Sequence, residues 1–86
     1  MAELKINIPE YDKEKGAISM WEDGFVIKSK VINDQIVISA NQSGLISLAK
    51  QLLFLAQIET PLGCHYHLDD CNSLESGSKE IVIGKI

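Results

Sequence analysis

The stretch that decides the fold is AISMWEDGFVIKSKVINDQIVISA, residues Ala17–Ala40. Two turn signals divide it: Asp23-Gly24, a strong signal for a tight β-hairpin, and the weaker Asn33-Asp34. Two-residue turns at both sites place Ile27 on the same face of the strands, so the two registers agree. The sequence therefore predicts a three-stranded antiparallel meander. Its core face would hold Ile18, Met20, Phe25, Ile27, Val31, Ile36, Ile38 and Ala40.

A helix is expected directly after the meander. Ser43 is the candidate N-cap and Pro61 stops any helix that continues past Ile58, so the predicted helix spans Ser43–Ile58. At 100° per residue its apolar side chains gather on one side, and Phe54 falls at the centre of the other, polar side. The residues expected to be buried are Leu45, Leu48, Ala49, Leu52, Leu55 and Ala56. The polar side holds Ser47, Lys50, Gln51 and Gln57.

Three further strands are expected, at Leu4–Ile8, Cys64–Asp69 and Glu80–Lys85. A chain of 86 residues has room for one hydrophobic core, which predicts a single domain, residues 1–86. The predicted fold class is α+β, a two-layer sandwich with one helix packed on an antiparallel sheet of five to six strands. The helix is expected to pack against Ile27, Ile36, Ile38, Tyr66, Leu68, Ile81 and Ile83.

The densest cluster of chemically versatile side chains is GCHYHLDDC, residues Gly63–Cys71. In a strand, His65, His67 and Asp69 share the outer face, whereas Cys64 points to the opposite face. A catalytic zinc ion needs three protein ligands in a shielded cleft, and the chain has no third histidine. We therefore expect no metal or cofactor here, and favour a half-solvated strand whose imidazoles contact carboxylates or a partner.

Nucleophilic catalysis is also disfavoured. Cys71 lies near His67 in the sequence, but no element marks an oxyanion hole beside such a pair. No glycine-rich phosphate-binding motif is present either. The chain is predicted not to be an enzyme.

The charges are unevenly distributed along the chain. The net charge is −4, and the segment Glu59–Glu80 accounts for all of it, with five acidic residues and one lysine. All eight basic residues are lysines, so no guanidinium fork can read phosphate or guanine, which argues against nucleic-acid binding. An acidic segment attracts a basic partner.

No apolar run approaches the roughly 20 residues that span a bilayer, and the N-terminus lacks the apolar core of a secretory signal. We therefore expect a cytoplasmic protein without a membrane partner, in which Cys64 and Cys71 are reduced thiols.

Trp21 falls on the outer face of the predicted meander, among β-branched side chains. Such patches are typical of protein interfaces. The predicted partner-binding residues are Asp69, Asp70, Glu75, His65, His67 and Trp21.

Three stretches in the C-terminal half carry a further signal: NQSGLISLAKQLLFLAQ (Asn41–Gln57), HYHLDD (His65–Asp70) and NSLESGSKEIVI (Asn72–Ile83). In sequence and spacing, over roughly residues 41–86, they resemble a family of small bacterial immunity proteins from polymorphic toxin systems, immunity protein thirty-two. The resemblance implies a cytosolic protein that binds and blocks a cognate protein toxin, without established catalytic residues. The alternative is a small self-associating accessory or binding domain, a homodimer that buries Trp21 or Phe54 between its subunits. A small metal-dependent hydrolase is the least favoured class.

Overall fold

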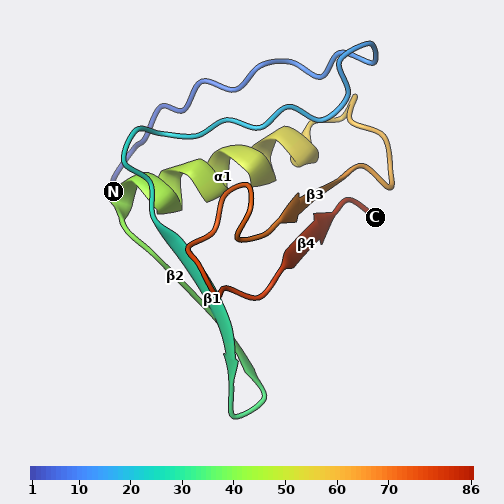
Figure 1. Cartoon of the computed structure of the whole chain (residues 1–86). Coiled ribbons are helices and arrows are strands. Elements are labelled where there is room, and N and C mark those ends of the chain that lie inside the picture. The colour runs from blue at the N-terminus through green and yellow to red at the C-terminus, as the bar shows by residue number, and fades with distance from the viewer.

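Helix α1 (Gln42–Ala56) lies in the middle of the molecule, with the N-terminal segments along one side and the strands on the other (Figure 1). The computed structural model describes the whole chain, residues 1–86. Its strands are β1 (Ile27–Ile32), β2 (Gln35–Ala40), β3 (His65–Leu68) and β4 (Ile81–Gly84). Strand β1 pairs with β2 and β3 pairs with β4, forming two separate antiparallel sheets of two strands. The predicted single sheet of five to six strands is therefore wrong, and with it the two-layer sandwich.

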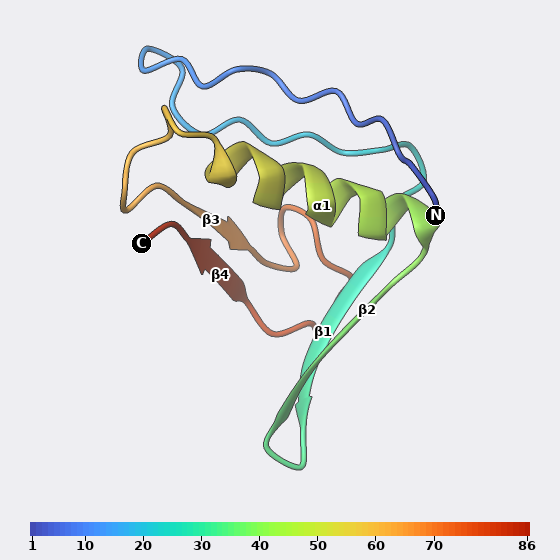
Figure 2. The ribbon, with the colours of Figure 1, turned by 180° about the vertical axis from the view of Figure 1, so that it is seen from behind.

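The hairpin of β1 and β2 has the predicted register. Ile27 lies opposite Ala40 and Val31 opposite Ile36. Asn33 and Asp34 both have positive φ angles, 50° and 63°, as a two-residue type I′ turn requires. The far half of this hairpin, residues 30–37, projects away from the rest of the molecule in both ribbon views (Figures 1 and 2). We call it the hairpin arm.

The other predicted hairpin does not form. The chain does turn at Asp23-Gly24, where Gly24 has φ 73° and the Phe25 N–H donates to the Glu22 carbonyl at 3.3 Å. The residues before the turn, however, run along α1 instead of pairing with β1, and Leu4–Ile8 is not a strand either. The predicted meander is thus reduced to one hairpin.

The partners that replace the missing strand are polar side chains of α1. The Gln51 side chain accepts from the Met20 N–H and donates to the Met20 carbonyl, both at 2.8 Å. The Ser47 hydroxyl accepts from the Glu22 N–H at 2.8 Å. One helix side chain thereby satisfies both backbone groups of Met20, as a neighbouring strand would.

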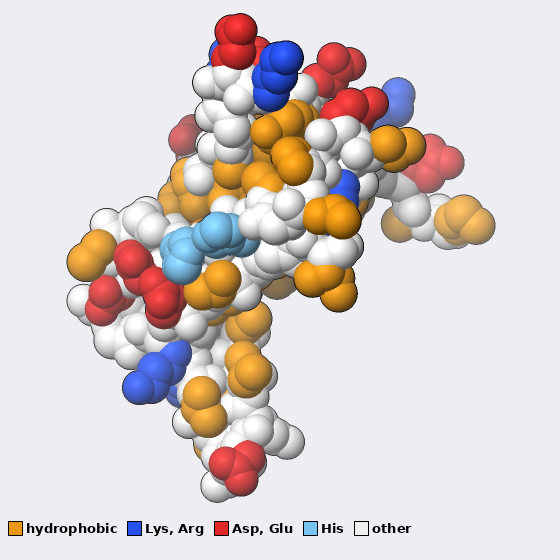
Figure 3. All heavy atoms as spheres, turned by 90° about the vertical axis from the view of Figure 1, so that its right-hand side faces the viewer, with side chains coloured by type: hydrophobic (Ala, Val, Ile, Leu, Met, Phe, Trp, Pro, Cys, Tyr) orange, Lys and Arg blue, Asp and Glu red, His pale blue; other side chains and the backbone are white.

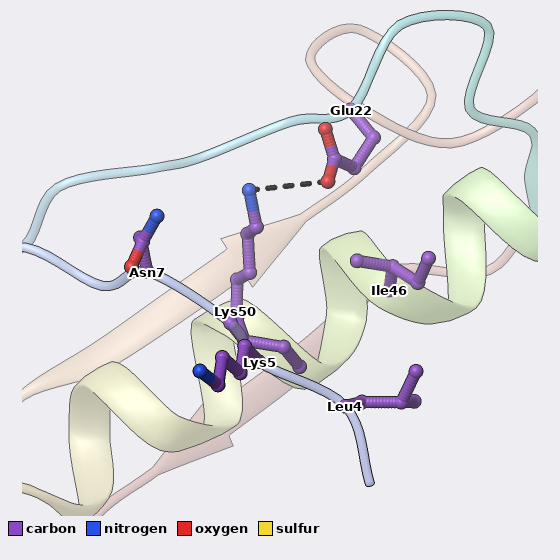
Figure 4. Close-up of a pocket in the computed structure, with 7 residues that line it drawn as sticks. Leu4, Lys5, Asn7, Glu22, Ile46 and Lys50 are labelled. Atoms are coloured by element: carbon purple, nitrogen blue, oxygen red, sulfur yellow. Dashed lines mark ion pairs between the residues drawn. The ribbon is translucent and has the colours of Figure 1, made fainter.

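Gln57, which directly follows α1, binds the backbone of residues 9–11 in the same way. Its side chain accepts from the Tyr11 N–H at 3.1 Å and donates to the Pro9 carbonyl at 3.0 Å. An ion pair between Lys50 and Glu22, with 3.2 Å between nitrogen and oxygen, links α1 to the segment before the turn (Figure 4). The N-terminal segments thus cover the polar side of the helix, which the sequence had assigned to solvent.

The face of α1 that is buried consequently differs from the predicted one. Phe54, expected outside, is fully buried, and its ring lies 6.2 Å from Tyr11 and 6.3 Å from Tyr66, between centroids. Leu45 and Leu52, expected inside, are 57% and 48% exposed. The buried hydrophobic core consists of Ile27, Phe54, Leu55, Tyr66, Leu68 and Leu74.

The start of the helix also differs in detail from the prediction. Asn41, and not Ser43, is the N-cap, since its side chain accepts from the Gly44 N–H at 2.8 Å. Gly44 lies so close to the start of β1 that a Cβ atom there would be 2.4 Å from the Val26 carbonyl oxygen. The absent side chain lets the helix meet the base of the hairpin.

The second hairpin completes the core from the other side. Tyr66 and Leu68 of β3 are buried while His65 and His67 are exposed, as the predicted alternation requires. The loop between β3 and β4 is hydrogen-bonded to β1, because the Glu75 N–H donates to the Ile27 carbonyl at 2.9 Å. None of the molecule's helical segments has the length and apolar character of a membrane span.

Candidate partner-binding site

The two histidines stand side by side on the outer face of β3. Their ring centroids are 4.9 Å apart. His67 lies opposite Val82, and its Nδ1 is 3.6 Å from a carboxylate oxygen of Glu80. His65 lies opposite Gly84, so no side chain on β4 covers it. The pair is therefore presented to solvent on a paired strand, with one acidic neighbour.

The acidic loop, residues 69–80, is held in shape by Asp69 and Asn72. The Asp69 carboxylate accepts from the N–H groups of Cys71 and Asn72, at 2.9 and 3.1 Å. The Asn72 side chain accepts from the Asp69 N–H at 3.0 Å and donates to the His67 carbonyl at 2.9 Å. Asp69 thus has a structural task within the loop.

Asp70 and Glu75 present their carboxylates outward from this fixed loop. Both residues are exposed. Asp70 has a weak contact of 3.4 Å from the Gly77 N–H, whereas Glu75 is anchored through its backbone to β1. The space-filling view shows the histidines beside a group of acidic side chains (Figure 3). Five of the six predicted site residues, Asp69, Asp70, Glu75, His65 and His67, therefore lie on β3 and the loop that follows it.

The remaining predicted residue, Trp21, lies elsewhere. Its ring stacks on Phe25, with centroids 4.8 Å apart and an interplanar angle of 19°. It is half-buried against the hydrophobic core, and its assignment to an outer sheet face is wrong because its segment is not a strand. A role for Trp21 in partner binding stays a prediction.

The ligand atoms of Asp69, Asp70 and Cys71 approach within 4.8 Å of one another, and neither histidine belongs to this group. The neighbouring carboxylates, Asp70 first and then Asp69, raise the pKa of the Cys71 thiol. A protonated thiol is a poor nucleophile and a poor metal ligand. The chemistry that this arrangement supports is recognition by charge and hydrogen bonding.

One residue that shapes the site was missed in the sequence. Asn72 closes the loop because its side chain contacts the backbone of both His67 and Asp69, which precede Asp70. An Asp followed three residues later by Asn, directly after a strand, is a pattern from which side-chain-closed turns can be inferred.

Together, the fold and the site define a small α+β domain, with histidines and carboxylates displayed on a short hairpin and a hydrogen-bonded loop. The family model described as Immunity protein 32 matches residues 35–86, which is more than half of the chain. The protein belongs to the immunity protein 32 family, as the resemblance in its C-terminal half predicted. No curated protein and no solved structure matches the chain.

Proposed function

We propose that the protein neutralises a cognate toxin of a polymorphic toxin system by binding it stoichiometrically in the cytoplasm and covering its active surface, without catalysis. Membership of an immunity protein family supports the toxin-neutralising role. The observation that carries the mode of binding is the rigid acidic loop beside two exposed histidines. This acidic surface comprises Asp69, Asp70, Glu75, His65 and His67.

The charge of this surface suits a basic partner. The segment Glu59–Glu80 contains five acidic residues and one lysine, and the carboxylates of Asp70 and Glu75 are exposed at its centre. Complementary charge accelerates encounter and suppresses wrong partners, and the effect weakens as salt screens it. A pre-ordered loop loses little conformational entropy on binding. The proposed partner surface is therefore basic, as in enzymes that act on nucleic acids.

The test is a charge reversal that spares the loop. In the double variant Asp70→Lys, Glu75→Lys the net charge rises from −4 to 0, because each reversal adds two units. Asp69 is kept because its carboxylate accepts two backbone N–H groups. The matched control is Glu10→Lys, Glu14→Lys, which reaches the same net charge at two exposed positions outside the acidic surface.

The readout is association of each variant with the product of the neighbouring toxin gene, at low and high salt. The loop variant should associate about tenfold or more slowly at low salt, and its rate should depend less on ionic strength. The control should associate like the parent. If both variants retain the parental rate and salt dependence while folded, the acidic surface does not meet the toxin.

A further inference from the structure

A second surface, distinct from the acidic one, is apolar and uncovered. By register, Val31, Ile36 and Ile38 share the hairpin face on which Ile27 and Ala40 meet the helix. Ile27 is buried, whereas Ile36 is 79% exposed. Leu45 and Leu52 continue the apolar character along α1. We call this set the uncovered face: Val31, Ile36, Ile38, Leu45 and Leu52.

The structure explains why these side chains have no cover. The N-terminal segments occupy the flank of α1 that carries Ser47, Lys50 and Gln57, and so leave the opposite flank open. The hairpin arm extends beyond the helix, and apolar side chains lie along it in the space-filling view (Figure 3). A groove beside the arm connects this surface to β4. Its apolar lining is Val31, Ile36, Ile81 and Val82, and its polar lining is Ser29, Lys30, Lys79 and Glu80.

The total exposed surface of the chain is also large for its mass, which indicates that part of it is covered by a partner. The chain exposes 6301 Å², whereas a globular monomer of its 9.5 kDa mass exposes about 5,000 Å². The excess is larger than the roughly 800 Å² that each partner contributes to a standard interface. Only 11 of the 86 residues are buried, so the single chain has a small core for its length. Both values are typical of a subunit that completes its core by association.

We propose that the uncovered face is covered by a second copy of this chain, with the hairpin arm of each protomer packed on α1 of the other. The face contains no charged side chain, and apolar interfaces of this kind, resembling a domain core cut in half, are typical of permanent homodimers. It pairs a projecting arm with a helix flank, so one two-fold axis brings each element onto its complement. An exposed apolar patch also promotes aggregation of the free protein, and a partner that covers it prevents this.

The dimer leaves the acidic surface for another partner. Asp70 and Glu75 are not part of the uncovered face, and the lysines of β1, Lys28 and Lys30, lie on the opposite side of the hairpin from Ile27. The dimer therefore does not depend on the proposed toxin-binding role, and each can fail without the other.

The experiment is sedimentation equilibrium of the full chain between about 1 and 100 µM, a range that covers typical homodimer affinities. The parent should sediment at twice the 9.5 kDa mass of the chain. Ile36→Lys should raise the dimer dissociation constant at least about 30-fold, because it places an unpaired charge in an apolar interface. The matched control is Leu62→Lys. Leu62 is 73% exposed, similar to the 79% of Ile36, but it lies in the loop before β3 and not on the uncovered face. This variant should remain dimeric.

Nuclear magnetic resonance on a mixed sample of isotope-labelled and unlabelled chains tests how the two copies pack on each other. Nuclear Overhauser contacts between the methyl groups of Ile36 and Leu52 across the two copies support the arrangement. A parent of 9.5 kDa throughout the range overturns the proposal. So does an Ile36→Lys variant with the dissociation constant of the parent, or a Leu62→Lys variant that dissociates. A monomeric parent whose Ile36→Lys variant fails to bind the toxin also overturns it, and assigns the face to the toxin.

Discussion

Gln51 joins the helix to the N-terminal half of the chain, and replacing it by methionine tests that connection. Its side chain is fully buried, with hydrogen bonds to both backbone groups of Met20 and to the Ser47 carbonyl. Methionine is similar in length and favours helices about as well as glutamine. The substitution Gln51→Met therefore removes the hydrogen bonds with little change in volume or helix propensity.

The expected loss of stability follows from the groups left without partners. A buried donor or acceptor that loses its partner costs about 1–3 kcal/mol, and Gln51→Met affects the N–H and the carbonyl of Met20. Water can reach half-buried Met20, so we take the lower part of that range for each group. The free energy of unfolding should fall by about 2–4 kcal/mol, a large share of the total stability of about 5–15 kcal/mol for a small domain.

The assay is urea unfolding, followed by helical circular dichroism and by the fluorescence of Trp21, which adjoins Met20. The matched control is Gln42→Met, at an exposed position in the first turn of the same helix, where the change should stay within about 0.5 kcal/mol. The Met20 amide should also exchange its hydrogen faster in Gln51→Met. If the two variants unfold at the same urea concentration, Gln51 does not hold the N-terminal segment and the burial of this helix face is wrong.

Two further predictions concern the core. Burial, followed by the charge of Cys64, raises the pKa of Tyr66 from 10.0 to about 12. The raised pKa favours the protonated phenol in the fold, so this contribution to stability is complete below pH 10. This stability, at most about 3 kcal/mol, should be lost as the pH rises from 10 through 12, and the loss should be smaller in Tyr66→Phe than in Tyr11→Phe when alkaline unfolding is compared. Gly44→Ala should lower the free energy of unfolding by about 1–3 kcal/mol, despite the better helix propensity of alanine, because the new Cβ lies 2.4 Å from the Val26 carbonyl oxygen. Gly84→Ala is its control, since that Cβ lies at an ordinary 3.5 Å from the His65 Cβ, and equal urea midpoints for the two variants would contradict the close packing at Gly44.

The features that the sequence predicted correctly are those fixed by local rules. The turn at Asn33-Asp34 and the alternation of β1 and β2 set one register, and the structure has it. Alternation also placed His65 and His67 outside and Tyr66 inside. The helix was predicted within two residues at each end. In each case neighbours in the sequence are sufficient to determine the result.

The orientation of α1 could not be predicted in this way. Periodicity ranks the sides of a helix by hydrophobicity, and by that ranking the side with Leu45 and Leu52 belongs inside. The structure buries the side with Gln51 and Phe54, because side-chain amides satisfy the backbone of an extended segment more than 30 residues away in the sequence. Such a partnership between a side chain and distant backbone has no period in the sequence.

The same error bears on the proposed dimer. An apolar stripe indicates that a surface avoids water, but it does not say whether the cover comes from the same chain or from another. Ile36, Ile38, Leu45 and Leu52 were predicted to pack together within one chain, and the structure leaves all four exposed. Packing across a two-fold axis would give them the burial that the pattern indicates.

The candidate site was predictable in composition but not in detail. The excess of acidic residues identified Asp70 and Glu75, and their exposure is as expected. The role of Asp69 in holding the loop depends on hydrogen bonds from two backbone N–H groups to its carboxylate, and a count of charges cannot reveal these. The position of Trp21 was wrong because it rested on a hairpin that does not form.

The family model matches only part of the chain, and the unmatched N-terminal part is hydrogen-bonded to α1 through its backbone. The model covers residues 35–86, which include α1, the acidic surface and four of the five residues of the uncovered face. The segment Pro9–Glu22 lies outside the match, yet it covers the polar side of the helix. Ser47, Gln51 and Gln57 bind its backbone N–H and carbonyl groups, which every residue except proline carries in full. Such contacts fix the path of the segment, and its side chains add to the packing, because Tyr11, Met20 and Trp21 lie against the hydrophobic core. The N-terminal segment therefore closes the core from outside the matched residues, while the acidic surface and all of the uncovered face except Val31 lie within the part of the chain that the family model matches.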